Sequence, residues 1–126
     1  MMDGPMLLLS DEVECQIDPA DLRQKIELPD GVLELYLGKT ADRLSTSGFL
    51  NLTIRDRSGR CWGCSIALIK NMNVTVKNQG QLKQPNTSTV MSVRLEGFEI
   101  HAFHWDGFAS RFDSRNMMLL SQSFTK

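Results

Sequence analysis

Residues Phe49 to Ile69 read FLNLTIRDRSGRCWGCSIALI, and this stretch decides the fold that we expect for the whole chain. In its first half apolar and polar residues alternate, which places one set of side chains on a single face of a β-strand: Leu50, Leu52 and Ile54. The second half alternates in the same way, with Trp62, Cys64, Ile66 and Leu68 on one face. Gly59, in the segment Asp56-Arg57-Ser58-Gly59 between the halves, can adopt the positive φ that a short hairpin loop requires. The stretch therefore predicts a β-hairpin, and further strands must cover its apolar face.

Length and composition limit what surrounds this hairpin. The chain has 126 residues, 41% of them hydrophobic and 23% charged, which is typical of one globular domain spanning residues 1–126. The formal net charge of -1 gives no general attraction to nucleic acid or to an anionic membrane, so either partner would need a locally basic face. The segment 1–9 has no basic residues and only a short apolar run, and the cysteine count of three is odd, so we expect a soluble intracellular protein with reduced thiols and no membrane contact.

The remaining segments predict a mainly β fold, a small antiparallel barrel or pseudobarrel of about six to seven strands with one or two short helices. Asp18-Pro19 resembles a helix or turn start, and the segment 32–37 predicts a short helix between an Asp30 N-cap and a left-handed Gly38. Asp106-Gly107 is a strong turn signal, and residues 78–89 form the longest expected loop. Strands are expected at 6–10, 25–28, 74–76, 90–94 and 98–105, with closing strands near Phe112 and at 117–120. The barrel core would span residues 6–113, and residues 114–126 would form a C-terminal strand or tail.

Three segments resemble, in order and spacing, the plant B3 DNA-binding domain, particularly its divergent reproductive-meristem branch. They are LRQKIELPDGVLELYLG, the hairpin segment DRSGRCW and the late segment GFEIHAFHWDGFASRF. The positions that match the family's pattern are Lys25, Pro29, Asp56, Gly59, Trp62, Gly97, Phe103, Asp106 and Gly107. The chain departs from that pattern after Val76, where the family's Gly-Trp is missing, and at Phe98, where the family often has Asp. The resemblance implies a nuclear, plant-type transcription regulator that binds double-stranded DNA.

The resemblance also implies which residues touch DNA. Two arms of the barrel would enter the major groove, one with Arg23, Gln24 and Lys25 and the other with Lys70, Asn71 and Asn73. Arg55, Arg57 and Arg60 of the hairpin would lie over phosphates. These residue types suit the task, since Arg and Lys bind guanine edges or phosphates and Asn and Gln can bind adenine. The competing interpretation is that all nine are ordinary solvated surface residues.

Two other functions remain open at this point. The run Met117-Met118-Leu119-Leu120, if exposed, would be a docking or dimerisation surface for another protein or a second copy of the chain. The segment 43–49, RLSTSGF, resembles the Ser-x-x-Gly turn of PilZ domains, which are small barrels that bind cyclic dinucleotides. That family needs Asp or Asn at the place of Arg43 and an upstream basic arm of which only Arg23 is present, so this function ranks third.

Metal binding and catalysis find less support. Cys61 and Cys64, together with His101 and His104, have ligand types that zinc prefers. Both pairs lie in predicted strands, however, where a separation of three places the two members on opposite faces. We therefore predict no metal, no cofactor and no catalytic residue, because the sequence also contains no nucleophile elbow, phosphate loop or HExxH.

Overall fold

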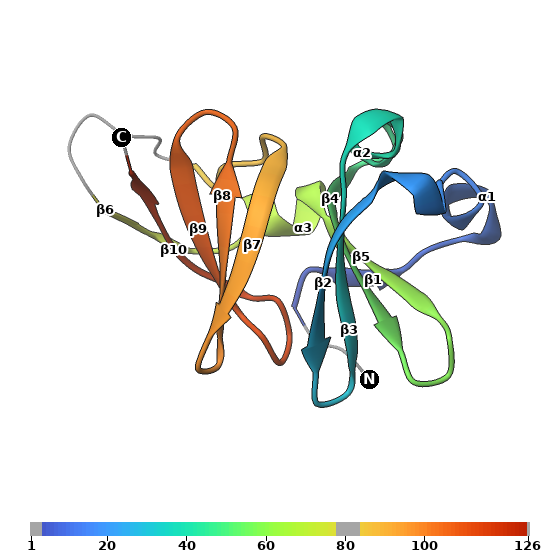
Figure 1. Ribbon diagram of the computed structural model, residues 1–126. Helices are drawn as coiled ribbons and strands as arrows, with labels where there is room; N and C mark the ends of the chain where they lie inside the picture. Colours follow the sequence, from blue (N-terminus) through green and yellow to red (C-terminus); the bar gives the residue numbers. More distant parts are fainter. Residues whose placement is uncertain (1–3, 78–83, 126) are drawn as a thin grey trace.

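A computed structural model describes residues 4–77 and 84–125, and in them ten strands form two five-stranded sheets (Figure 1). Sheet A has the order β1-β5-β4-β3-β2 and sheet B the order β6-β10-β9-β8-β7. All neighbours are antiparallel except β6 and β10, which are parallel. The strands of sheet A are β1 (Met6–Leu8), β2 (Leu22–Leu28), β3 (Gly31–Tyr36), β4 (Phe49–Asp56) and β5 (Cys61–Ser65). Those of sheet B are β6 (Thr75–Lys77), β7 (Val90–Glu96), β8 (Glu99–His104), β9 (Phe108–Asp113) and β10 (Leu119–Phe124).

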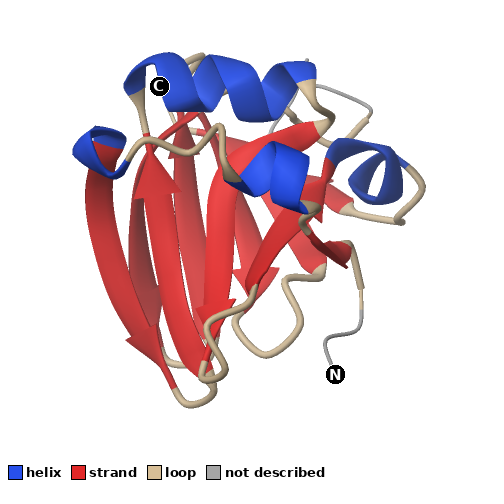
Figure 2. Ribbon diagram, turned by 90° about the vertical axis from the view of Figure 1, so that its right-hand side faces the viewer, coloured by secondary structure: helices blue, strands red, loops and turns tan. Residues whose placement is uncertain are grey.

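The mainly β class and the small barrel-like arrangement are confirmed, with a correction to the number of strands, which is ten in the described residues rather than six or seven. These strands pair as two five-stranded sheets, and no closed barrel forms in the part of the chain that the structure describes. The short helices are α1 (Asp11–Glu14), α2 (Gly38–Thr46), α3 (Ile66–Lys70) and a 3-10 turn, η1 (Pro19–Asp21). The helices gather mainly at one end of the molecule (Figures 1 and 2). None of the helices in the described part of the chain has the length and apolar character needed to cross a bilayer.

The predicted hairpin is confirmed in its first strand and its turn, and it ends earlier than expected. Leu50, Leu52 and Ile54 are buried, and Gly59 has a φ of +89° at the turn between β4 and β5. The chain leaves the sheet at Ser65, whose side chain accepts a hydrogen bond from the backbone N–H of Leu68 and so caps α3. The sequence of a short apolar run such as 66–69 is compatible with a strand and with a buried helical turn. The hydrogen bond from Leu68 to Ser65 stabilises the helical turn here.

The helix predicted over 32–37 is wrong. These residues lie in β3 and after it, and β3 pairs with β2 on one side and β4 on the other. A central strand that is buried on both faces has a nearly continuous apolar sequence, and periodicity alone does not distinguish it from a short helix. Asp30 lies in the turn between β2 and β3 rather than at an N-cap, and Gly38 has the expected positive φ, of +65°, but begins α2 instead of ending a helix.

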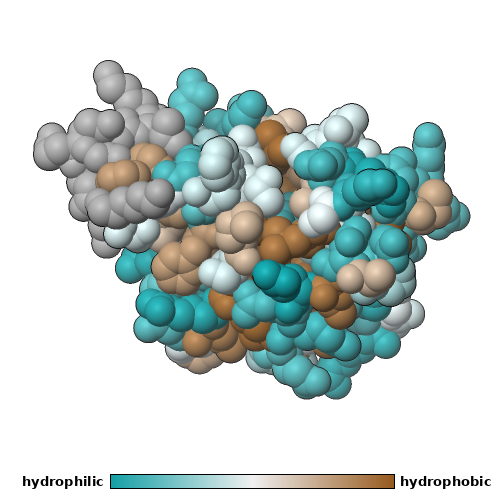
Figure 3. Space-filling model, turned by 45° about the horizontal axis from the view of Figure 1, so that its top comes forward, coloured by the Kyte–Doolittle hydropathy of each residue, from teal (hydrophilic) through white to brown (hydrophobic). Residues whose placement is uncertain are grey.

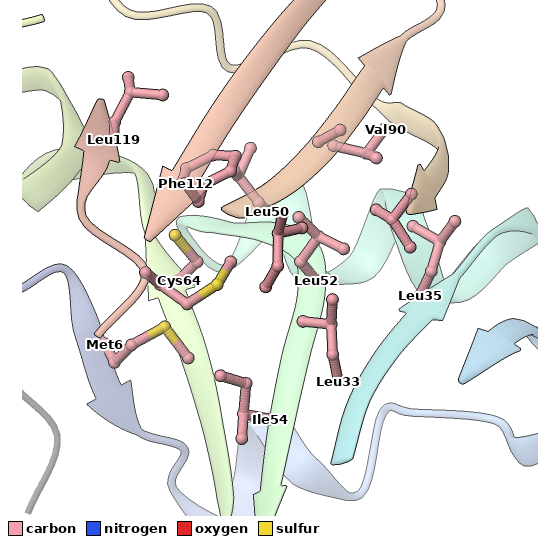
Figure 4. Close-up of a cluster of buried hydrophobic side chains, with 14 of the residues drawn as sticks. Met6, Leu33, Leu35, Leu50, Leu52, Ile54, Cys64, Val90, Phe112 and Leu119 are labelled. Carbon is pink, nitrogen blue, oxygen red and sulfur yellow. The ribbon is translucent and has the colours of Figure 1, made fainter. Parts of the chain in front are cut away.

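The main core lies between the two sheets (Figure 4). It combines side chains from both, among them Leu33, Leu35, Leu52, Ile100 and Phe112, all at most 1% exposed. A second, smaller cluster contains Leu9, Leu44 and Cys61. The apolar face of β4 therefore packs against sheet B, as the alternation in its sequence predicts.

Two side-chain amides join sheet A to the backbone of β7. The side chain of Asn51 donates to the backbone oxygens of Tyr36 (2.8 Å) and Val90 (2.7 Å), and its Oδ1 accepts from the Val90 N–H (3.0 Å). Gln24 pairs with Val93 in the same way, donating to its carbonyl (3.1 Å) and accepting from its N–H (2.8 Å). Each amide thus satisfies a donor and an acceptor of a sheet edge that would otherwise be exposed or unpaired.

The C-terminal apolar run is part of the core, so the expectation of an exposed surface there is wrong. Met117 is fully buried and Leu119 is 3% exposed, while Leu120 at 37% is the most open of the run. Leu119 and Leu120 begin β10, which pairs with β9 and β6. The interaction surface that the sequence suggested at 117–120 is therefore largely occupied by contacts within the chain.

Candidate nucleic-acid interface

The first predicted arm lies on β2, an edge strand of sheet A. Its side chains alternate strictly, so that Arg23 and Lys25 are exposed while Gln24 and Ile26 are half-buried. The amide of Gln24 is held by Val93, as described above. Arg23 and Lys25 form no hydrogen bond or ion pair with other described residues, and their cationic groups face solvent.

The second predicted arm follows β5. Lys70 is the last residue of α3 and Asn71 is its C-cap. Both residues, and Asn73 after them, are exposed. Within the described part of the chain their side chains make no hydrogen bond, so their donors and acceptors face solvent.

The strand register brings these two arms to the same end of sheet A. Leu22 pairs with Tyr36 and Leu35 with Leu52, while Phe49 pairs with Ser65, so the start of β2 and the end of β5 lie at one end. The sheet order places three strand spacings between β2 and β5, which is about 14 Å. The major groove of B-DNA is about 12 Å wide. Figure 3 brings this end forward and shows many hydrophilic side chains around apolar ones that lie between the sheets.

The hairpin arginines lie at the opposite end of sheet A, because Asp56 pairs with Gly31 and Gly31 pairs with Leu28. Arg55 forms ion pairs with Glu14 (2.9 Å) and Glu34 (3.6 Å), and the hydrogen bond to Glu14 raises the pKa of its guanidinium. Arg57 donates to the carbonyl of Pro29. Arg60 donates through Nε to the Ser58 hydroxyl (3.1 Å). The structure therefore separates these three arginines from the two arms.

Asp56 organises the hairpin turn that carries these arginines. Its carboxylate accepts hydrogen bonds from the Ser58 N–H (2.9 Å) and hydroxyl (2.6 Å), the Arg60 N–H (3.0 Å) and the Trp62 indole N–H (2.9 Å). The bonds from Ser58 and Trp62 hold the pKa of Asp56 well below its usual range. The spacing Asp-x-x-Gly-x-x-Trp thus has a structural reason, since the carboxylate fixes both the turn backbone and the indole.

The cysteine and histidine pairs do not form one site. Cys61 belongs to the small cluster and Cys64 to the main core, and burial raises the pKa of both thiols, that of Cys61 to about 11. The histidines are on β8 of sheet B, where His101 contacts Glu96 (3.1 Å) and Glu99 (3.5 Å). In the described ranges no group of three or more His, Cys, Asp or Glu side chains is arranged to hold a metal ion.

His104 instead has a structural role. Its Nδ1 lies 2.7 Å from the Ser88 carbonyl and its Nε2 lies 2.7 Å from the Ser110 hydroxyl. Because a carbonyl only accepts, Nδ1 carries the proton and Nε2 accepts from Ser110 in the neutral ring. Burial lowers the pKa of His104. Ser110 is fully buried, so this Ser-His pair has no access to a substrate.

The segment that resembles the PilZ turn is distributed over two elements. Residues 43–46 complete α2, and Ser47 and Gly48 connect it to β4. The Arg43 guanidinium donates to the carbonyl of Gln16 (3.2 Å), and the Ser47 hydroxyl to the side chain of Gln16 (3.4 Å). The polar groups of this segment are thus partly engaged within the chain.

The structure also forms a cleft that the sequence did not indicate. It has a volume of about 460 Å³ and lies at the hairpin end, between the two sheets. Trp62 and Arg60 reach it from sheet A, and Phe98 and Arg115 reach it from turns of sheet B. These residues are far apart in the sequence and share no spacing pattern, and the only available signal was the isolated apolar Phe98 after Gly97.

Comparison of this chain with family models, with curated proteins and with solved structures finds no match.

Proposed function

We propose that this chain binds double-stranded DNA through the end of sheet A that carries the two arms. One observation supports this most directly: two sets of exposed side chains without partners among the described residues lie on β2, which begins at one end of sheet A, and after β5, which ends there. These two strands are about 14 Å apart, which is close to the width of the major groove. The second arm continues beyond β5 at the end of α3 and after it. The contacts would come from Arg23, Lys25, Lys70, Asn71 and Asn73.

The two arms offer different kinds of contact to DNA. Arg23, Lys25 and Lys70 supply cationic groups that bind phosphates or guanine, while Asn71 and Asn73 offer amides that can pair with an adenine edge. Gln24 holds β7 and is not one of the contacts that we propose. The hairpin arginines at the far end are not contacts in this arrangement either. As a B3-like domain the chain would act in transcription regulation in a plant nucleus.

The net charge of -1 makes the salt dependence of binding informative. Each phosphate contact adds about -0.9 to the slope of log K against log salt. Three cationic contacts would give a slope of about -2.7. A chain without a basic face would show little slope, because its overall charge is nearly balanced.

The test is a fluorescence-anisotropy titration of labelled random-sequence duplexes at two salt concentrations, followed by selection and sequencing of the retained duplexes. The variant Arg23→Ala/Lys25→Ala/Lys70→Ala should lose affinity at least tenfold and should show a smaller salt slope. A matched control, Arg57→Ala/Arg60→Ala/Arg115→Ala, removes the same charge from exposed residues at the hairpin end of the molecule. It should bind nearly as the native chain does.

Equal weakening in both variants would contradict the proposal, because it would show that only total charge matters. If the native chain bound no duplex at low salt, the DNA-binding proposal would be overturned altogether. Circular dichroism of each variant confirms folding before the comparison is made.

A further inference from the structure

The cleft between the sheets has the size and composition of a small-ligand site. Its volume of about 460 Å³ lies within the range of ligand pockets. Leu28, Ile54 and Trp62 of sheet A form apolar walls, and all three pack against the main core. The cleft lies at the opposite end of sheet A from the two arms, as the pairing of Gly31 with Asp56 requires.

The indole of Trp62 is fixed in this wall. Its only polar atom, Nε1, donates to Asp56, so no unsatisfied donor of the ring is directed at the cleft. Asp56 in turn accepts four hydrogen bonds, from Ser58, Arg60 and Trp62. The carboxylate is thus satisfied within the turn, and the ring presents an apolar surface to a ligand.

Phe98 completes the aromatic lining from sheet B. It follows Gly97 in the turn between β7 and β8, and 72% of its surface is exposed. It is the most exposed of the large apolar residues described. The guanidinium of Arg115 lies 5.8 Å from the centroid of its ring. An exposed aromatic ring at the rim of an apolar cleft is a feature of binding sites.

Two guanidinium groups at the rim have N–H donors without a hydrogen-bond partner in the described residues. The side chain of Arg60 is 62% exposed and bonds the Ser58 hydroxyl only through Nε, which leaves its terminal nitrogens without a hydrogen bond in the described residues. The side chain of Arg115 is 72% exposed and bonds Asp113 through Nε and one terminal nitrogen. Asp30 also lines the cleft. The rim thus combines two exposed guanidinium groups with Asp30, and each guanidinium keeps terminal N–H donors that Asp56 and Asp113 do not occupy.

We propose that this cleft binds a small aromatic anion, with the ring system against Trp62 and Phe98 and its carboxylate or sulfonate at Arg60 and Arg115. Guanidinium groups suit such an acceptor because they form charge-assisted, often bidentate hydrogen bonds. The aromatic side chains contribute contact area with preferred stacking geometries.

The probe is 1-anilinonaphthalene-8-sulfonate, an aromatic sulfonate, and its neutral comparison is N-phenyl-1-naphthylamine, which has the same rings without the sulfonate. The chain contains two tryptophans, so a Trp105→Phe background leaves Trp62 as the only indole. Trp105 is 68% exposed and does not line the cleft, so this change should preserve the fold. We expect saturable quenching of Trp62 fluorescence by the sulfonate with one site per chain.

Variants in this background then separate the two parts of the site. Arg60→Gln/Arg115→Gln should weaken binding of the sulfonate about tenfold, the effect of losing roughly one charge-assisted bond. It should leave binding of the neutral amine unchanged. Phe98→Ala should weaken both probes, whereas Met91→Ala, a matched loss of an exposed apolar side chain outside the cleft, should weaken neither.

Absence of saturable quenching would overturn the proposal. So would equal affinities for the charged and neutral probes, or equal effects of Phe98→Ala and Met91→Ala. DNA binding by Phe98→Ala should match that of the native chain, because the cleft and the arms lie at opposite ends of sheet A. The two proposals can therefore fail independently.

Discussion

Replacement of Asn51 by Ala should lower the free energy of unfolding about as much as truncation of a buried leucine does, because this amide joins the two sheets by hydrogen bonds. Asn51 is 3% exposed and makes three hydrogen bonds, two to the backbone of Val90 and one to the carbonyl of Tyr36. Its removal leaves the buried Val90 N–H without the acceptor that it has in the native chain. The sheets would stay in contact through apolar side chains, but this polar link would be lost.

The magnitude follows from the groups left behind. An unsatisfied buried donor costs about 1 to 3 kcal/mol, and each lost carbonyl bond costs about 1 kcal/mol more. We expect a loss of about 3 to 5 kcal/mol in the free energy of unfolding, a large part of the roughly 5 to 15 kcal/mol typical of a domain. With an m-value of about 2 kcal/mol/M in urea, the midpoint should fall by about 2 M.

The assay is equilibrium unfolding in urea, followed by circular dichroism, with Asn71→Ala as the matched control. Asn71 is exposed and its side chain has no partner in the described residues, so that variant should stay within about 0.5 kcal/mol of the native chain. Amide hydrogen exchange in Asn51→Ala should show lost protection at Val90 in particular. A midpoint shift below about 0.5 M, with Val90 still protected, would refute the role assigned to this amide.

Three further predictions concern ionisable groups. Hydrogen bonds lower the pKa of Asp56 in the folded state, so its contribution to stability should be present above the unfolded value of about 3.9 and should be lost as the pH falls below it; unfolding of native chain and Asp56→Asn as a function of pH should show a shallower acid dependence in the variant. Burial also lowers the pKa of His104, so its contribution should be complete above about pH 6.5 and should decline on acidification below that value; an NMR titration of the imidazole that gave a pKa above 6.5 would contradict this. Cys15 is exposed whereas Cys61 and Cys64 are buried, so a thiol reagent such as Ellman's should modify one cysteine quickly in the native chain and all three in denaturant.

Local sequence patterns predicted those elements whose apolar residues are confined to one face. The alternation in β2 and β4 indicated strands for this reason, although β4 is buried on both faces, with Asn51 and Thr53 on its polar face. The turns at Gly59 and Gly107, with φ of +89° and +93°, were predicted because glycine adopts these angles without strain. Asp18 caps η1 as expected, because its side chain accepts from the Ala20 N–H.

Patterns failed where burial on two faces or a local cap decided the outcome. The apolar segment in β3 was predicted to be a helix, since a strand covered on both sides loses its alternation. The run 66–69 was predicted to continue a strand, but the Ser65 cap turns it into α3. The Met117 to Leu120 run was expected on the surface, whereas residues 117 and 119 pack into the core.

For the candidate sites too, the sequence predicted some features and the tertiary structure decided others. The sequence by itself predicted Arg23, Lys25 and Lys70 as DNA contacts, from the family resemblance and because cationic side chains suit phosphates and guanine. Only the tertiary structure decided that these lie at one end of sheet A, that Gln24 and Arg55 are engaged within the chain, and that Trp62 and Phe98 share a cleft. Strand order and register determine such distances, and they arise from contacts between residues distant in sequence that no local spacing encodes.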